Sequence, residues 1–309
     1  MTSPSYTVTK LGVCCAILVT AAFACRVDAD EYFKSYAVSG RADVHVHADN
    51  GSVNFITADG SKVEFDVKYE KSEWGGGSGD GPQIDSRQDG NVVELTAVTP
   101  EHTWLGHGSR RLGIEVHMPK DADLRLETSN GSVAVSSLNG HITIRTTNGA
   151  VRAALLAGTI DISSTNGGII LDALQGSVKV QTSNGGIRAT ALDGKCELAT
   201  SNGGIHVTGR FEWLDITSGN GAVVARAESG STMSSAWSIR TTNAGVSLAL
   251  PTGFKANLDA STSNGRITLD LPAELQGTRS ESQAHGPVNG GGPSLVIHTS
   301  NGSIHIAAT

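Results

Sequence analysis

The sequence predicts an all-β protein, a parallel β-solenoid with 18-residue coils, two strands in each coil, and irregular β-strand caps at both ends. Three observations predict this fold class. Asn-Gly recurs at a spacing of 18 residues, a pair of apolar residues flanking one outward residue recurs every nine residues, and no long helical pattern occurs. A strict period of this kind indicates repeated units that stack on one another.

Composition narrows the class of protein further. Charged residues make up 17% of the chain, too few for a disordered acidic protein, and the apolar patterning is too regular for a linker. The formal net charge is −7 and no run of Lys and Arg occurs, which argues against a nucleic-acid partner.

Residues 1–24 are expected to be a signal peptide. The apolar run at residues 11–24 is 14 residues long, too short to span a bilayer, and Ala22-Phe23-Ala24 supplies a small-x-small cleavage pattern. Cys25 follows directly, as the acylated cysteine does in a bacterial lipoprotein, although Ala22 and Phe23 depart from the usual residues of such a signal. We expect export to the cell envelope, in the periplasm or at the cell surface. Two fates of Cys25 stay open, a lipid anchor or a position beside a signal peptidase I site.

The cysteines offer no disulfide framework. Cys14 and Cys15 lie inside the signal, which leaves Cys196 alone once Cys25 is assigned to the mature N-terminus. Cys196 falls at a core position of the repeat, where a buried cysteine behaves as a small hydrophobe rather than a nucleophile.

Residues 30–126 are predicted to be an N-terminal β-strand cap module. Val63, Phe65, Val67 and Tyr69 alternate with polar or charged residues, which is typical of a half-buried strand. Residues 72–90 are rich in Gly and lack any period, so we expect a loop there.

Residues 127–231 are predicted to form the regular solenoid. When each nine-residue unit is numbered from the Asn of Asn-Gly, positions four and six are apolar in every unit and are expected to point inward. These positions are Val133, Val135, Ile142, Ile144, Val151, Ala153, Ile160, Ile162, Ile169, Leu171, Val178, Val180, Ile187, Ala189, Cys196, Leu198, Ile205, Val207, Leu214, Ile216, Val223 and Ala225.

The corners between strands are expected to carry ladders of polar side chains. Stacked asparagines form amide–amide hydrogen bonds, tolerate the left-handed conformation that a corner can need, and precede a Gly that permits the bend. The asparagines of this structural ladder are Asn130, Asn148, Asn166, Asn184, Asn202 and Asn220. A second ladder is expected from Thr128, Thr146, Thr182 and Thr200.

Residues 232–309 are predicted to be a C-terminal segment of irregular β repeats that ends in a cap. Strand patterns persist at residues 246–250, 267–271 and 295–306, but the strict spacing is lost. Residues 272–294 are rich in Gly and polar residues and are expected to form a second loop. Such ends cover the strand edges that an open solenoid would expose.

No catalytic, cofactor-binding or metal-ligating residue is predicted. A calcium-binding nonapeptide roll needs Asp at the position that Leu171, Ala189 and Val207 occupy here. Asp161, Asp172 and Glu197 are outward, as carboxylates of a polysaccharide-cleaving β-helix would be, but they are expected to fall at different phases of the repeat, which favours solvated charges.

His45 and His47 share one face of a strand and are the remaining metal-ligand candidates. A transition metal would need a third ligand, for which His102, His107 and His117 are the available side chains. An exposed pair of histidines is the simpler interpretation.

The repeat resembles a known bacterial family. The step Met118-Pro119-Lys120, the repeated Thr-Ser-Asn-Gly units and a final Thr299-Ser300-Asn301-Gly302 are similar to the β-strand repeat adhesin family catalogued as domain of unknown function 4097. The resemblance covers residues 32–307 and implies an exported or envelope-associated β-solenoid with no established catalytic residues. The unit at Phe211-Glu212-Trp213 lacks Asn-Gly, and with the two long Gly-rich segments it departs from the family pattern.

We therefore expect an exported, non-enzymatic, structural or adhesin-like protein that presents a binding surface in the cell envelope. Its partner would be an envelope protein or a surface polysaccharide, with no cofactor, no nucleic acid and no membrane contact other than a lipid at Cys25. Two alternatives stay open, a carbohydrate-active β-helix enzyme and an envelope-stress accessory protein that binds a membrane partner.

Overall fold

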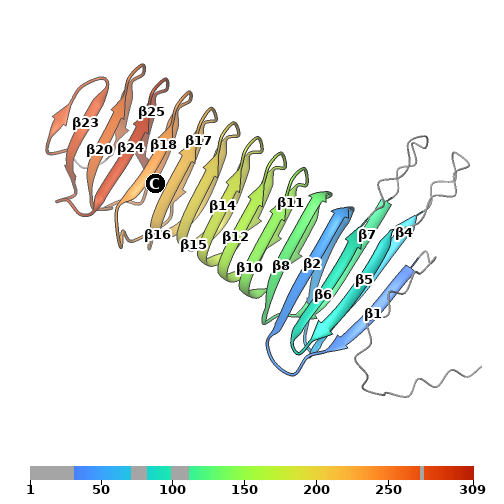
Figure 1. The fold of residues 1–309 in the computed structure, drawn as a ribbon. Coiled ribbons are helices and arrows are strands. Elements are labelled where there is room, and N and C mark those ends of the chain that lie inside the picture. Colours follow the sequence, from blue (N-terminus) through green and yellow to red (C-terminus); the bar gives the residue numbers. More distant parts are fainter. Residues whose placement is uncertain (1–30, 71–81, 99–110, 272–274) are drawn as a thin grey trace, which may run out of the picture.

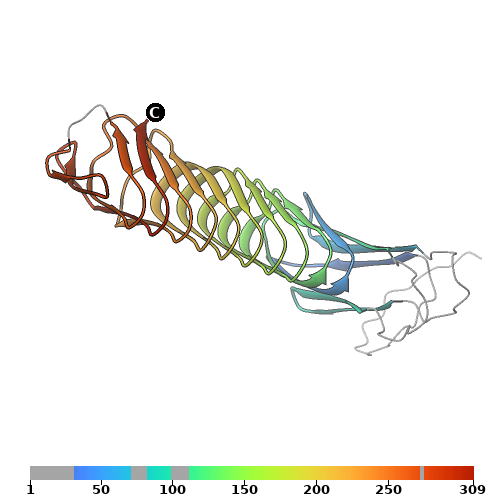
Figure 2. The same ribbon diagram turned by 90° about the horizontal axis from the view of Figure 1, so that it is seen from above.

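The protein is an elongated coil of β-strands. The computed structural model describes residues 31–70, 82–98, 111–271 and 275–309. Its 25 strands belong to one mostly parallel sheet that winds about a long axis (Figures 1 and 2). The described residues contain no helix, and hence none that could cross a membrane. The prediction of an all-β, solenoid-like fold is confirmed. The predicted signal peptide, residues 1–24, and Cys25 lie outside the described residues.

Two rows of strands form the middle of the coil. The long-strand row contains β8, β10, β12 and β14, and the short-strand row contains β9, β11, β13 and β17, while β15 and β16 each continue from the short row into the long row. Their bounds are β8 (Ala122–Asn130), β9 (Val133–Ser136), β10 (Asn139–Thr146), β11 (Val151–Ala154), β12 (Ala157–Ser164), β13 (Ile169–Asp172), β14 (Gln175–Thr182), β15 (Ile187–Thr200), β16 (Ile205–Ser218) and β17 (Val223–Ala227).

Residues of the same phase lie side by side in neighbouring strands. Ile142 pairs with Ile160, and Ile160 pairs with Val178, each in parallel register. The register shifts between β15 and β16, where Gly194 pairs with Phe211 but Lys195 pairs with Trp213. This β-bulge falls on the unit in which Phe211 takes the place of the corner glycine, so the missing glycine corresponds to a local irregularity in the coil.

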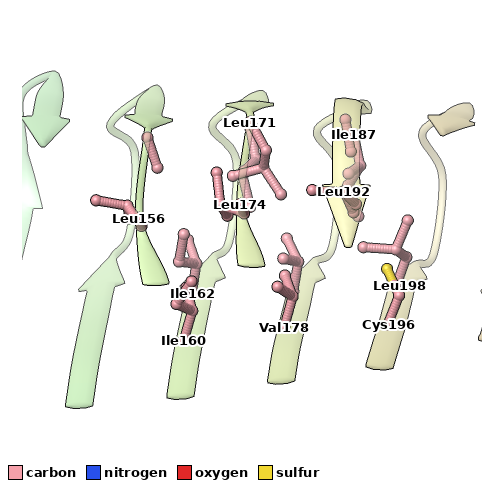
Figure 3. Close-up of a cluster of buried hydrophobic side chains, with 14 of the residues drawn as sticks. Leu156, Ile160, Ile162, Leu171, Leu174, Val178, Ile187, Leu192, Cys196 and Leu198 are labelled. Carbon is pink, nitrogen blue, oxygen red and sulfur yellow. The ribbon is translucent and has the colours of Figure 1, made fainter. Parts of the chain in front are cut away.

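The core is a set of apolar columns inside the coil. All the inward positions predicted from the repeat are buried, which confirms that assignment. Figure 3 shows these side chains meeting between the two rows, among them Ile160, Leu171 and Ile187. A further buried column at the bend between the rows was not predicted; it consists of Leu138, Leu156, Leu174 and Leu192.

The N-terminal end is built from an inserted coil and three covering strands. The coil β2–β3 lies between β6–β7 and β8–β9, and β4, β5 and β1 then pair antiparallel with β7, β6 and β4. The bounds are β1 (Glu31–Ala37), β2 (Ala42–Asn50), β3 (Ser52–Ala58), β4 (Lys62–Glu70), β5 (Gln83–Asp89), β6 (Val92–Val98) and β7 (Arg111–Pro119). The prediction of a loop through residue 90 is wrong for β5, which is polar because it is an edge strand with a largely exposed surface.

The C-terminal end repeats this arrangement with a second inserted coil. Strand β24 lies between β18 and β20, and β25 lies between β19 and β21, so the chain ends beside β19 and not at the tip of the rod (Figure 1). The bounds are β18 (Trp237–Thr241), β19 (Val246–Leu250), β20 (Ala256–Thr262), β21 (Ile267–Asp270), β22 (Thr278–Arg279), β23 (Gln283–Val288), β24 (Ser294–Thr299) and β25 (Ile304–Ala308). The loop predicted at residues 272–294 is wrong for β23, which pairs antiparallel with β20.

Candidate binding surfaces

The structure brings the corner asparagines together in one continuous ladder. Asn148 Nδ2 donates to Asn130 Oδ1 at 2.6 Å, and each later asparagine donates to the one before it at 2.6–2.7 Å as far as Asn220. The ladder also runs beyond the six asparagines named from the sequence. The additional members are Asn50, Asn243, Asn301 and Asn264.

The corners need glycine because the coils approach closely there. A Cβ atom on Gly167 would lie 1.7 Å from the carbonyl oxygen of Gly149, and one on Gly185 would lie 2.0 Å from that of Gly167. The expected left-handed asparagines are not found among the ladder residues. The left-handed non-glycine residues of the repeat lie at the opposite bend, at Ser137, Leu155, Ala173 and Ala191.

The predicted threonines do stack in register, Thr146 beside Thr128 and Thr200 beside Thr182. Except at Thr128, the hydrogen bonds of their buried hydroxyls go to backbone groups and not to one another. Thr182 Oγ1 accepts from Gly185 N at 3.2 Å and donates to Gly167 O at 3.2 Å, so it ties its own corner to the corner of the preceding coil. Ser164 and Ser218 make the same pair of bonds in other coils. Thr128 Oγ1 is buried with no partner among the described residues.

A groove of about 460 Å³ runs along the outside of the short-strand row. One side is a column of outward side chains paired in register across neighbouring strands. This column consists of Arg152, Ile170, Arg188, His206 and Val224. The other side consists of the small residues Ala150, Gly168, Gly186, Gly204 and Ala222. We call this feature the short-strand groove. The sequence analysis missed it, although its large and small columns recur at the period of the repeat.

Apolar and cationic side chains share the surface of the short-strand groove. Ile170 is 43% exposed and Val224 is 38% exposed, which is unusual for large aliphatic residues in this chain. Arg152 and Arg188 are exposed on either side of Ile170. Such a mixture suits a ligand that carries both anionic groups and apolar faces.

The outer surface of the long-strand row is charged, and its charges pair with one another. Lys179 Nζ lies 2.9 Å from Glu197 Oε1, and the hydrogen bond between them raises the pKa of Lys179. Asp161 lies beside Lys179 in register, whereas Asp172 lies on the short-strand row, where it accepts a hydrogen bond from Thr190.

A carboxylate pair on this surface was overlooked in the sequence. Asp215 stands 18 residues after Glu197 and pairs with it in register, so two carboxylates lie on adjacent strands. Partial burial raises the pKa of Asp215, and the charge of Glu197 adds to this effect, while Arg240 opposes it. The expectation that the outward carboxylates fall at different phases of the repeat is therefore wrong for Asp161 and Glu197, which share one outward column with Asp215.

The histidine candidates are held by carboxylates. His45 Nε2 lies 3.0 Å from Asp43 Oδ1, and His47 Nε2 lies 3.7 Å from Asp49 Oδ1. His117 is on β7, in the short-strand row, and so on the other face from His45 on β2. His102 and His107 lie outside the described residues, and within the described ranges no three His, Cys, Asp or Glu side chains are grouped as metal ligands.

Cys196 occupies the core position that the repeat assigns to it. Its side chain is 1% exposed, and burial raises the pKa of the thiol. A thiol held in its protonated form and screened from solvent is structural.

Comparisons with known proteins place the sequence in a family. A family model described as Toastrack DUF4097 matches residues 49–307. None of the curated proteins matches this chain.

Three solved structures are similar over most of their length. A candidate cell adhesion protein from Clostridium sporogenes is 12% identical with a TM-score of 0.25, covering 90% of this chain and 99% of that chain. Candidate adhesins from Bacteroides fragilis and Parabacteroides merdae are each 7% identical, with TM-scores of 0.34 and 0.33, covering 90% of this chain and 97% of theirs.

Proposed function

Because the chain belongs to the Toastrack DUF4097 family, we propose that it is an exported, non-enzymatic β-solenoid of 18-residue coils that presents an adhesin-like binding surface in the cell envelope. The observation that carries this proposal is the distribution of apolar surface. The interior of the coil is filled by columns of buried side chains, while an open groove runs along one outer face. A ligand would therefore meet the protein on its outer faces.

The repeated corners support a role that needs a rigid rod. Asparagine bonds join each corner to the next, and hydroxyl–backbone bonds from Ser164, Thr182 and Thr200 add to them, so adjacent coils are linked by side chains as well as by the sheet. Such a scaffold holds its outward residues at fixed spacings and can present them to an extended partner.

Export and anchoring belong to the same proposal and rest on the N-terminal sequence. The apolar run at residues 11–24 is of signal-peptide length, and Cys25 follows it. Fractionation of cells that express the full chain, followed by mass spectrometry of the mature N-terminus, tests this part. A lipid on Cys25 or cleavage beside it supports export, and an unprocessed cytoplasmic chain contradicts the proposal.

Glu197 and Asp215 favour one alternative, a carbohydrate-active enzyme. Adjacent parallel strands lie about 4.8 Å apart. This backbone spacing is close to the separation of about 5–5.5 Å between the two carboxyl groups of retaining glycosidases. The raised pKa of Asp215 is also the property of a general acid. Lys179 is bonded to Glu197, however, and this ion pair occupies the carboxylate that would act as the nucleophile.

The two functions are separated by an activity measurement. The wild-type chain and the variants Glu197→Gln and Asp215→Asn are incubated with a panel of polysaccharides, and reducing ends are measured. We expect no release above the protein-free control for any of the three proteins. Turnover by the wild type that both substitutions abolish would replace the proposed binding function with hydrolysis.

A further inference from the structure

The short-strand groove gathers unpaired positive charge in an acidic chain. The formal net charge of the protein is −7, yet no Asp or Glu lines the groove. Within the described part of the chain, the side chains of Arg152 and Arg188 make no ion pair or hydrogen bond. Asp172, two residues after Ile170 on β13, accepts a hydrogen bond from Thr190 Oγ1 at 2.7 Å. Unneutralised guanidinium groups attract anionic ligands and repel cationic ones.

On the opposite face of the coil, in contrast to the groove, cationic side chains have acidic partners. On the long-strand row, Arg125 lies 3.1 Å from Glu127, Lys179 lies 2.9 Å from Glu197, and Arg210 is bonded to Asp193. Cations on that face are largely neutralised by neighbouring carboxylates, whereas those of the groove remain available to a ligand.

The groove cations recur along the axis of the rod. Arg152 pairs in register with Ile170, and Ile170 with Arg188, so the two arginines stand two strand spacings apart, about 10 Å. Ile170 lies between them, and Val224 lies beyond His206 in the same column. A ligand that lies along the rod would therefore meet both cationic and aliphatic side chains of this column.

Backbone pairing limits what kind of polymer can lie there. Strands β11 and β13 pair with a neighbour on both sides, as do residues 187–189 of β15. An acidic peptide could not add a strand to this part of the sheet, because no free edge is present. A peptide that crossed the strands would also gain no main-chain hydrogen bonds from them.

A sugar polymer does not need those main-chain bonds. Its acid groups can bind guanidinium side chains in a bidentate manner, and its apolar ring faces can pack against aliphatic groups such as Ile170 and Val224. The row of glycines and alanines beside the column leaves room for the rings.

From this geometry we propose that the short-strand groove binds a linear acidic polysaccharide that lies along the rod axis, with its acid groups on Arg152 and Arg188. This inference rests on the proposed binding function and adds the chemical class of the ligand and the residues that recognise it.

Direct binding to polygalacturonate tests the inference. The full chain is titrated by calorimetry with polygalacturonate, with neutral dextran and with poly-L-glutamate at the same ionic strength. The groove variant is Arg152→Gln/Arg188→Gln. The matched control, Arg125→Gln/Arg145→Gln, makes the same change of charge on the long-strand face. Thermal unfolding of each variant establishes that it is folded.

We expect polygalacturonate to bind, and dextran and poly-L-glutamate to bind at least tenfold more weakly. The groove variant should lose roughly tenfold in affinity, the effect of two exposed ion pairs. The control should stay within about twofold. Ile170→Glu, which places a carboxylate between the two arginines at an exposed position, should weaken binding to a similar degree.

Three results would overturn the inference. These are no binding of polygalacturonate by the wild type, equal losses in the groove variant and its control, or equal affinity for poly-L-glutamate, which would identify an acidic peptide as the ligand. If polygalacturonate fails but the processed protein is still recovered from the envelope, this inference falls and the proposed function stands. An unprocessed cytoplasmic chain contradicts the proposed function itself.

Discussion

Asn301 Nδ2 donates to Asn243 Oδ1 at 2.9 Å, although 58 residues separate the two in the chain. Asn264 follows Asn243 in the sequence, yet it bonds to the outer side of Asn301, at 2.8 Å. The last segment of the chain thus supplies the next-to-last rung of the ladder. Because β24 and β25 fill this place, the preceding segment can join the sheet only through them.

Ile306→Asp is expected to release the C-terminal end of the rod while the middle stays folded. Ile306 is buried on β25, between β19 and β21. An unpaired carboxylate there would separate β25 from the sheet, and β21 would then lose the strand with which it pairs. Hydrogen exchange should accelerate at residues 256–270 and 294–308 and remain slow at residues 142–200. His305→Asp, on the outward side of the same strand, is the control. Unchanged protection of residues 256–270 in Ile306→Asp would show that β20 and β21 are held independently of β25.

Ile187→Asp is expected to destabilise the rod by at least about 3 kcal/mol, because it buries an unpaired charge in the apolar column. Ile187 is 2% exposed. Ile170, on the neighbouring strand β13 of the same row, is 43% exposed and gives a matched control. Ile170→Asp should change the free energy of unfolding by less than about 1 kcal/mol. Urea unfolding followed by circular dichroism measures both, and equal losses would contradict the inward assignment.

Gly167→Ala is expected to cost about 2–4 kcal/mol, since its methyl group would overlap the carbonyl oxygen of the coil beside it. The added Cβ would lie 1.7 Å from Gly149 O, while a Cβ on the adjacent Gly168 would lie 3.7 Å from Gly186 O, an ordinary contact. Gly168→Ala should therefore change stability by no more than about 1 kcal/mol. Thermal unfolding of the two variants compares neighbouring glycines directly, and a tolerated Gly167→Ala would rule out close approach as the reason for glycine.

Asn184→Ala is expected to weaken the rod by roughly 1–3 kcal/mol, more than Asn264→Ala. Asn184 donates to Asn166 and accepts from Asn202, each at 2.7 Å, so its removal leaves a donor and an acceptor without partners. Asn264 stands at the end of the ladder and makes one ladder bond, to Asn301. Chemical unfolding should separate the two variants. If the terminal substitution proved the more damaging, the ladder would not act through paired amides.

Asp215→Asn is expected to stabilise the protein at neutral pH. Burial raises the folded-state pKa of Asp215 above its unfolded value, so the folded state holds the proton more tightly than the unfolded state does. The carboxylate therefore destabilises the fold once the pH exceeds the folded pKa, and this penalty disappears as the pH falls below the unfolded value. The thermal midpoint of Asp215→Asn should exceed that of the wild type at pH 7, and the difference should shrink as the solution is acidified. A gain that grows in acid would have the wrong sign. Asp161→Asn, in the same outward column, serves as the control.

The interior could be predicted because it is periodic. Stacked coils place residues of equal phase side by side, so the inward columns and the corner asparagines follow from counting along the chain. Edge strands carry no such signal. Strand β5 (QIDSRQD) buries little of its surface and therefore shows no clear alternation of apolar and polar residues. The pairing of Glu197 with Asp215 was available from the same count and was overlooked.

By itself, the sequence determined the class of the fold, its core and the spacing of its corners, because these depend on interactions that repeat with the chain. Only the tertiary structure decided which distant segments become neighbours, such as β25 between β19 and β21, because that choice depends on the strand edges left free elsewhere. It also decided which charges stay unpaired. Lys179 and Arg152 are both outward cations of the repeat, but Lys179 has Glu197 on the neighbouring strand and Arg152 stands in a groove without a carboxylate. Pairing of charges is a property of the assembled surface, since it depends on which side chains the coils bring together.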